Sequence, residues 1–384
     1  MVNGTKYKPK ERIISFPQMG NTYIPLKALL ETLGAKVVLP PTNNKTALDL
    51  GVRHSIEGIC LPYKLNLANY IMALEKGANT LMMFQAPGSC RFGNYVRMSV
   101  QTLQEMNYDF EMVVFDMYKS QMKEVIKTFC YVSGVRNPFT IFKAFKLGFE
   151  KFYACDEAEK KLFYIRPREL KKGSAEKKYK KALKLIDAAK TSRELKRVNK
   201  EFLKEFNAIE IDNNKDVPII YLIGEFFVLL DPYTNMEIEK ELGKLGVEVQ
   251  RQIMFSDWLD NVLKPGFLYK KESHRKRAAR YAKKFITRPI GGECLESVGD
   301  AVMAARNNID GVVHLSPFTC TPEIVAQNIL TQVSKQEDIP ILSLILDEQT
   351  GKTGFITRLE AFTDLVKRKR YKKSFSFNKD SDKC

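Results

Sequence analysis

Short apolar runs alternate along the chain with segments of helical spacing. Near the N-terminus, the apolar run 13–16 is followed by helical spacing from Pro25 to Leu33, by Gly34, and by a second apolar run at 36–39. A glycine often follows the last turn of a helix, and short apolar runs between helices are typical of buried strands. The pattern therefore predicts a strand–helix–strand unit.

The same order recurs in the second half of the chain. The apolar run 218–224 is followed by helical spacing over 236–245, by Gly246 and by a new strand at 247–249. Strands that alternate with helices in this way form parallel sheets covered by helices. We expect an α/β fold with two related Rossmann-like lobes.

Between these halves lies a segment rich in Lys, Glu, Ala and Leu, with amphipathic spacing over 174–189 and 192–206. It predicts a helical insertion between the lobes. We expect four parts along the chain: an N-terminal α/β lobe over 1–134, the insertion over 135–215, a C-terminal α/β lobe over 216–368, and a flexible basic tail over 369–384.

Three cysteines stand at predicted helix starts. Cys90 follows an apolar strand and a Pro-Gly turn, Cys320 follows a strand and a Pro-containing turn, and Cys60 precedes Pro62 and a helix. Ligands of open α/β sheets gather at the carboxyl ends of strands, and helix N-termini favour thiolates. Three such cysteines would hold a [4Fe–4S] cluster by three irons and leave the fourth open. The alternative is that each is a small core residue.

The chain has seven cysteines and no CxxC pair, so a disulfide framework is not indicated. Cys130 lies in a helical-looking segment and is expected to pack in the core. Cys155 and Cys294 fit either a core position or a ligand position, and Cys384 is terminal.

Several stretches resemble a known family. The segments GICLPYKLNLANYI, GSCRFGNY and PFTCTPEIVAQNIL resemble the 2-hydroxyacyl-CoA dehydratase family, and GGECLESVGDAV and DEQTGKTGFITRLEAF resemble its acyl-CoA dehydratase activase-related branch. The resemblance implies that Cys60, Cys90 and Cys320 are the metal ligands and that a [4Fe–4S] cluster lies between the lobes. It also implies one-electron supply by an ATP-hydrolysing activase, itself an iron–sulfur protein. In the related dehydratase subunits, a 2-hydroxyacyl-CoA is then dehydrated through a ketyl radical.

Some features depart from the family pattern. Glu293 stands where the family leads us to expect a histidine, which leaves Cys294 incidental or an extra ligand. Some relatives carry a larger double-cubane cluster, for which Cys130, Cys155 and Cys294 are the candidate further ligands. The phosphate-loop pattern GxxxxGK[ST] is absent from the sequence, and the run 351–353 has only its last part.

Three residues are candidates for catalysis. Glu225 ends the predicted strand 219–224, where such sheets place site residues. Arg91 follows Cys90 and would neutralise a cluster or a thioester, or else pair with an acid. His314 lies inside an apolar strand and is a ligand, an acid or a buried structural histidine.

Three more residues are candidates for contact with the cofactor. Lys64 would balance cluster charge or be a surface lysine. Tyr95 would donate a hydrogen bond near Cys90 or pack over the turn. Glu323 stands in a helix first turn, where an acid also favours the helix dipole.

The formal net charge is +17, and two basic stretches, 171–184 and 270–284, contribute much of it. They are interpreted as solvated helix faces, as docking sites for an acidic protein or for CoA phosphates, or as nucleic-acid contacts. No recognised nucleic-acid-binding motif accompanies them, so nucleic acid is not the favoured partner. The sequence has no run of eighteen apolar residues and no signal-peptide core. We expect a cytoplasmic protein without membrane contact.

The sequence thus favours an iron–sulfur redox protein that accepts low-potential electrons from an activase and reduces a small substrate or a CoA thioester. One alternative is a catalytic or companion subunit of a 2-hydroxyacyl-CoA dehydratase, acting as a homo- or heterodimer. Another is a non-enzymatic module that binds nucleic acid or an acidic protein.

Overall fold

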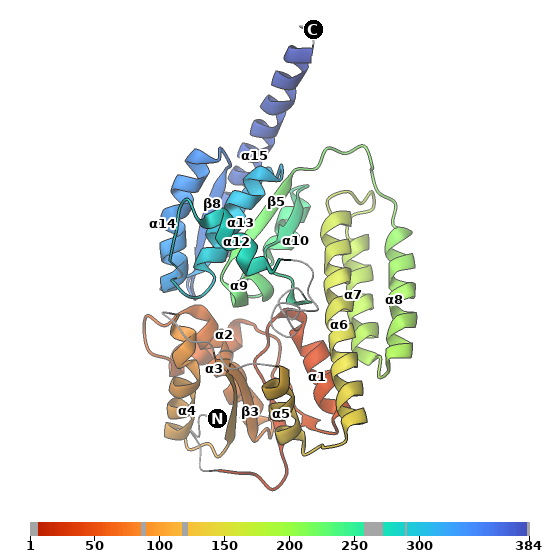
Figure 1. Cartoon of the computed structure of the whole chain (residues 1–384), viewed down its shortest axis with the longest axis vertical. Coiled ribbons are helices and arrows are strands. Elements are labelled where there is room, and N and C mark those ends of the chain that lie inside the picture. The colour runs from red at the N-terminus through yellow and green to blue at the C-terminus, as the bar shows by residue number, and fades with distance from the viewer. Residues whose placement is uncertain (1–6, 86–89, 117–121, 257–271, 289, 382–384) are drawn as a thin grey trace.

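Two four-stranded parallel sheets form the frame of the molecule (Figure 1). The computed structural model describes residues 7–85, 90–116, 122–256, 272–288 and 290–381; the side chains of 116, 122 and 373–381 are not described. The strand orders are β2-β1-β3-β4 and β6-β5-β7-β8, so each sheet places its first strand beside its second and third. This shared order confirms the predicted α/β fold with two Rossmann-like lobes.

The elements of the N-terminal lobe are β1 (Ile13–Ser15), η1 (Gly20–Thr22), α1 (Tyr23–Thr32), β2 (Lys36–Val37), α2 (Lys45–His54), α3 (Leu61–Glu75), β3 (Thr80–Gln85), η2 (Arg91–Asn94), α4 (Tyr95–Glu105), β4 (Glu111–Asp116) and α5 (Met122–Ser133). Alternate side chains of β3 point to opposite faces, as the pleat requires. Leu81 and Met83 pack against α3 and α4, whereas Met82 packs against α1 and α5.

The elements of the C-terminal lobe are β5 (Ile219–Gly224), α9 (Phe226–Leu230), α10 (Ile238–Lys244), β6 (Glu248–Arg251), α12 (His274–Ala282), α13 (Cys294–Arg306), β7 (Gly311–Pro317), α14 (Thr321–Gln336), β8 (Ile341–Leu346) and α15 (Lys352–Ser381). Ile223 and Val312 face α12, α13 and α14. Leu222 and Val313 face the other side of the sheet, with α9, α10 and α15.

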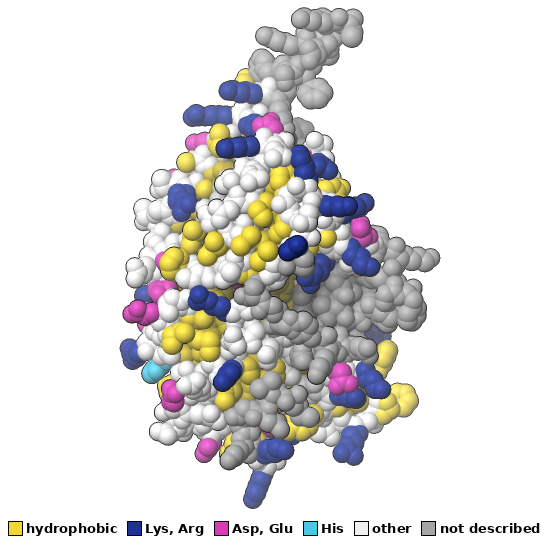
Figure 2. Space-filling model, turned by 60° about the vertical axis from the view of Figure 1, so that its left-hand side comes forward, with side chains coloured by type: hydrophobic (Ala, Val, Ile, Leu, Met, Phe, Trp, Pro, Cys, Tyr) yellow, Lys and Arg dark blue, Asp and Glu magenta, His cyan; other side chains and the backbone are white. Residues whose placement is uncertain are grey.

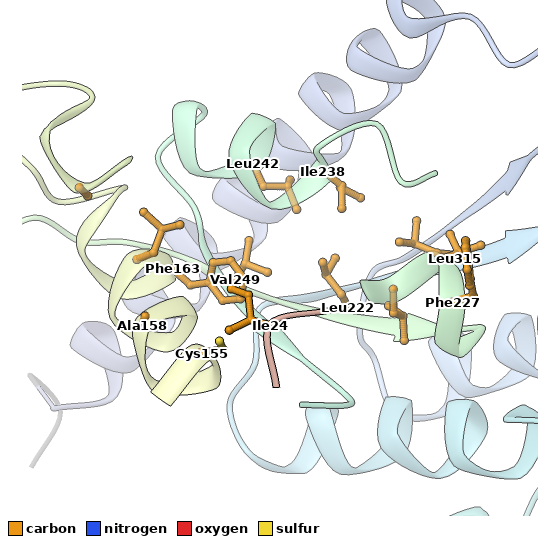
Figure 3. Packing of buried hydrophobic residues seen from close by; sticks show 14 of the residues in the cluster. Ile24, Cys155, Ala158, Phe163, Leu222, Phe227, Ile238, Leu242, Val249 and Leu315 are labelled. Carbon is orange, nitrogen blue, oxygen red and sulfur yellow. The ribbon is translucent and has the colours of Figure 1, made fainter. Parts of the chain in front are cut away.

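Three helices, α6 (Pro138–Ile165), α7 (Ser174–Ala188) and α8 (Ser192–Asn207), lie between the lobes in sequence and beside both in space (Figure 1). The N-terminal half of α6 packs on the first lobe, where Phe145 joins the core. Its C-terminal half reaches the second lobe. Figure 3 shows Ile24 of α1, Cys155 of α6 and Val249 of β6 lying together in one apolar cluster. The helical segment therefore ties the two lobes together.

The C-terminal end is helical up to Ser381, and the flexible basic tail over 369–384 stays a prediction. Helix α15 continues to Ser381 and extends away from the body of the molecule (Figure 1). The segment from 352 to 381 contains no proline, and its one glycine, Gly354, lies in the first turn. Since no helix breaker follows, the helix continues beyond the sheet that it covers. Among the described helices, none is long and apolar enough to cross a membrane.

The lobes are joined by polar contacts as well as by the apolar core. Asn43 Nδ2 donates to Asp231 Oδ2 at 2.9 Å, and Thr319 Oγ1 donates to the carbonyl of Gly58 at 2.8 Å. Gly20 approaches the backbone of Leu230 so closely that a Cβ would overlap its carbonyl oxygen. The lobe interface therefore leaves no room for a side chain at position 20.

We predict that Gly20→Ala destabilises the protein more than Gly34→Ala does. Both glycines have positive φ, +52° and +78°, but a Cβ at Gly34 has no atom within 4 Å. Left-handed backbone alone costs alanine about 1–2 kcal/mol, and overpacking adds about 1–3 kcal/mol. Urea unfolding of both variants measures the difference, and equal losses would contradict the close approach between the lobes.

A buried charge cluster also joins the helical segment to the second lobe. Arg251 of β6 contacts Glu159 of α6 and lies 3.4 Å from Glu239 of α10. Asp156 lies nearby on α6 and accepts a hydrogen bond from the backbone N–H of Ser256 at 2.7 Å. Burial, followed by the charge of Glu159, raises the pKa of Asp156 to about 6.

We predict that Asp156→Asn changes the pH dependence of stability. The native pKa lies above the ordinary value of 3.8, so the contribution of Asp156 is present at low pH and is lost as pH rises through about 6. The variant should match the wild type at pH 4 and exceed it at pH 8 by about 2–3 kcal/mol. Chemical unfolding at both pH values measures this. The exposed Asp364→Asn serves as the control, and a difference independent of pH would contradict the assignment.

Candidate functional site between the lobes

The three predicted ligand cysteines occupy the same local position. Cys60 is the N-cap of α3, Cys90 the N-cap of η2 and Cys320 the N-cap of α14. Their backbones are extended, and proline stands in the first turn after Cys60 and Cys320. Proline suits that position because its missing N–H has no partner in a first turn. The sequence pattern therefore places each thiol where a loop enters a helix.

The structure brings these cysteines to one place between the lobes. A Cβ at Gly292 would lie 2.9 Å from Cγ of Pro322 and 3.9 Å from Cβ of Cys90, so the start of α14 adjoins η2. Burial is the main cause that raises the pKa of each thiol. Cys60 raises the pKa of Cys90 further, and Cys90 does the same for Cys320. The sulfurs are thus close enough to interact electrostatically.

The helix ends favour the thiolates, but burial opposes them. Burial raises the pKa of Cys60, and it raises that of Cys90 to about 12. The pKa of Cys320 is raised still further, first by burial and then by Glu225 and Glu323. Backbone N–H groups stabilise the thiolates of Cys90 and Cys320, but desolvation outweighs them. Ionising these thiols therefore costs more free energy than it does in water.

Two carboxyl groups of the second lobe face the thiols. Glu225 caps α9, with its Oε2 accepting the N–H of Val228 at 2.9 Å, and burial raises its pKa to about 7. Glu293 precedes α13, and burial, followed by the charges of Glu225 and Glu323, raises its pKa well above the ordinary value. Glu225 also raises the pKa of all three cysteines. The site therefore concentrates groups that become negative on losing a proton.

His314 and Glu323 form a fully buried pair beside the cysteines. His314 Nε2 lies 2.7 Å from Glu323 Oε2, and its Nδ1 lies 3.2 Å from the hydroxyl of Ser343. Ser297 donates to the same Glu323 oxygen at 3.0 Å, whereas no described group donates to Glu323 Oε1. Glu323 lies in the first turn of α14, where an acid also favours the helix dipole. Its side-chain partners are the histidine and the serine.

Tyr95 and Arg91 lie on the side of the first lobe. The Tyr95 hydroxyl is 2.6 Å from Cys60 Sγ, and its ring meets Tyr63 and Phe92 edge to face. Arg91 donates to the carbonyl of Gly58, and its charge lowers the pKa of Cys60 slightly against burial. Tyr95 is therefore a direct partner of a thiol, while Arg91 acts on the site through its charge.

Lys64 is not on the surface. Its side chain is 6% exposed, and its Nζ lies 2.5 Å from Oε1 of Glu348, in the loop after β8. The pair joins α3 of the first lobe to the second lobe. The charge of Lys64 is therefore paired with the carboxylate of Glu348.

The other cysteines lie in different surroundings. Cys155 is buried in the core that joins the lobes (Figure 3), and Cys294 is buried at the start of α13, close enough to Glu323 for that acid to raise its pKa. Cys130 is half-buried on α5, less than the core packing expected of it. Cys384 lies outside the described residues.

A cavity of about 230 Å³ has Cys90 in its wall. Its lining is mostly apolar and comes from both lobes, with Cys90, Tyr95, Glu225 and Glu293 among the polar or ionisable side chains. Phe16 follows β1 and Glu225 follows β5, so the cavity lies at the carboxyl ends of both sheets. This is the position that parallel sheets give to their ligands.

The three thiols are the candidate ligands of an iron–sulfur cluster. Within the described ranges, no three His, Cys, Asp or Glu side chains are arranged to hold a metal ion. Thiols that receive backbone N–H groups, as Cys90 and Cys320 do, are nevertheless of the kind that ligates iron–sulfur clusters. Cys60, Cys90 and Cys320 would each bind a cluster as a thiolate.

Sequence reasoning missed part of this site. The sequence marks Glu293 only as a departure from the family pattern, where a histidine is expected. It gives no sign that Glu293 belongs to the site. Asn66, one turn after Pro62 on the same face of α3, gave no signal because nothing in a single sequence marks an inward-facing amide. The phenylalanines of the cavity come from segments far apart in the chain, so no local pattern groups them.

The fold and the site define a two-lobed α/β protein with a cysteine-lined cavity between its lobes. The chain belongs to the CoA enzyme activase uncharacterised domain family, whose model matches residues 17–254, more than half of its length. The match includes Cys60, Cys90 and Glu225 and ends before Glu293 and Cys320. No curated protein matches the chain.

We predict that Glu348→Gln destabilises the protein by about 2 kcal/mol, because it leaves the buried Lys64 cation without its partner. The matched control is Asp49→Asn, which breaks the exposed Lys45–Asp49 pair on α2 and should cost less than about 0.5 kcal/mol. The double variant Lys64→Met/Glu348→Gln should recover most of the loss. Denaturant unfolding measures all three, and equal effects of the two single changes would contradict a buried bridge between the lobes.

Proposed function

We propose that this protein is an iron–sulfur redox protein in which Cys60, Cys90 and Cys320 hold a [4Fe–4S] cluster between the lobes. The single observation that carries the proposal is the meeting of three N-cap thiols from both lobes in one buried site. Ligation of the cluster would require the three buried thiols to lose their protons, so metal binding would have to meet that cost.

The cluster would supply one-electron transfer at an iron that no cysteine occupies. The residues of the chain do the rest. The backbone N–H groups of Phe92 and Glu323 donate to the sulfurs of Cys90 and Cys320 and so favour the thiolate forms. Tyr95 lies within hydrogen-bond distance of Cys60 Sγ. Glu225 and Glu293 face the cavity, where they would hold or receive a proton beside a bound substrate.

We place an ATP-hydrolysing activase upstream as the electron donor. The family description, a CoA enzyme activase uncharacterised domain, supports a link to an activase in general. The sequence lacks a GxxxxGK[ST] phosphate loop, so ATP hydrolysis of that class is assigned to the partner. The reduced product would come from a small substrate or from a CoA thioester.

A catalytic or companion subunit of a 2-hydroxyacyl-CoA dehydratase is the second candidate. The observation that favours it is the cavity beside Cys90, since a pure electron carrier needs no room for a substrate. Acyl-CoA binding by the purified chain, together with co-purification of a related subunit, would distinguish this function from simple electron transfer.

The basic stretches do not point to nucleic acid. On α12, Arg275 pairs with Glu296 and Arg280 with Glu272, and on α7 Lys181 contacts Glu205. On the face shown in Figure 2, Lys and Arg side chains are scattered among acidic and apolar ones. Charges interleaved in this way are typical of solvated helix faces. They give no support to a nucleic-acid-binding module.

We predict that anaerobically purified protein is brown and contains about four irons per chain. Cys60→Ser, Cys90→Ser and Cys320→Ser should each lower the iron content and the visible absorbance at least several-fold, because each removes a thiolate ligand. Iron analysis and absorbance spectroscopy measure this.

Cys130→Ser, a change on α5 at a half-buried cysteine, is the control and should keep the iron. Cys294→Ser tests the extra-ligand alternative at the start of α13, and it should also keep the iron if three cysteines suffice. A colourless wild type after anaerobic reconstitution would end the proposal.

A further inference from the structure

The cavity between the lobes has a composition that restricts what it can bind. Its walls are dominated by phenylalanine, from strand ends, loops and helices of both lobes. An apolar cavity of about 150 Å³ can hold benzene, so the present cavity of about 230 Å³ has room for one ring and a few further atoms. Aromatic walls favour a flat apolar guest through edge-to-face contacts.

The described lining of the cavity favours an uncharged group. No Lys, Arg or His belongs to this lining, whereas Glu225 and Glu293 do. A carboxylate or a phosphate there would lose its water without gaining a counter-charge from the described lining. Lys64, two residues before Asn66 on α3, is engaged with Glu348. Among the described groups, the lining therefore suits a neutral guest better than an anion.

An amide oxygen in the wall has no hydrogen-bond partner among the described residues. Asn66 is 4% exposed and lines the cavity, and no described group donates to its Oδ1. An unmade hydrogen bond of a buried group costs about 1–3 kcal/mol. Glu225 and Glu293 add further acceptors on the cysteine side. A guest with a hydroxyl would satisfy groups that a hydrocarbon leaves unpaired.

We propose that the cavity binds an uncharged aromatic group of about one ring that carries a hydroxyl hydrogen-bond donor, placed against Phe16, Phe115, Phe129 and Asn66 and open toward Cys90 and Glu225. Binding of this group stands on the cavity alone. Its role as the substrate that is reduced rests on the function proposed above. The free acid of the same skeleton is excluded.

Three small probes of nearly equal size test the proposal on the full anaerobically purified chain: benzyl alcohol, ethylbenzene and benzoate. Binding is followed by calorimetry or by ligand-observed NMR, with and without cluster reconstitution. Benzyl alcohol should bind at least tenfold more tightly than benzoate. Comparable binding of the two, or no binding of benzyl alcohol, would overturn the proposal.

Two substitutions locate the probe. Leu26→Phe adds volume at a half-buried position of the lining and should weaken benzyl alcohol binding at least tenfold, while Leu203→Phe, the same change on α8 outside the cavity, should not. Asn66→Leu should shift the preference for benzyl alcohol over ethylbenzene by about three- to tenfold toward ethylbenzene, as one hydrogen bond predicts. Unchanged binding in Leu26→Phe, or an unchanged preference in Asn66→Leu, would contradict the assigned site.

The two proposals fail separately. Benzyl alcohol binding by a chain that takes up no iron on anaerobic reconstitution would keep the cavity assignment and end the iron–sulfur function. A chain that binds iron but not benzyl alcohol would keep the iron–sulfur function and end the cavity assignment. Because neither readout depends on turnover, the missing electron donor does not limit the test.

Discussion

The structure depends on two parallel sheets that direct their carboxyl ends at one another. Each lobe places its first and third strands side by side, and the segments that follow those strands carry Phe16, Cys90, Glu225 and Cys320. Because parallel strands all end at the same edge of a sheet, residues far apart in the chain gather there. Each lobe has such a sheet edge, and the two edges face each other across the interface. The residues gathered at them are therefore enclosed from both sides.

This enclosure explains the electrostatics of the site. In water, thiols and carboxyls so close together would be screened, but between the lobes desolvation raises the pKa of every cysteine and of Glu225 and Glu293. The cost of ionising any one of them is high while its neighbours are also buried. The iron–sulfur proposal rests on the meeting of three thiols in this enclosure, and ligation of iron would have to meet the cost of ionising them.

The lobes are held in place by contacts that lie away from this site. Helix α6 packs on both lobes, the Arg251 cluster joins it to the second sheet, and the Lys64–Glu348 pair crosses the interface near the cysteines. The walls of the cavity come from both lobes. The contacts that hold the lobes relative to one another therefore also determine the shape of the cavity. Positioning of the site and stability of the fold are therefore linked.

The sequence alone determined the parallel strands, the helices and the local setting of Cys60, Cys90 and Cys320, because these follow from spacing and from Pro and Gly positions within about ten residues. It did not determine that burial would outweigh the helix dipole at the thiols, that Lys64 would be buried against Glu348, or that Glu323 would lie against the buried His314. It also gave no sign of the cavity with Asn66 in its wall. Those features arise from contacts between segments up to about 280 residues apart, and only the packing of one lobe on the other decides which side chains lose their water together.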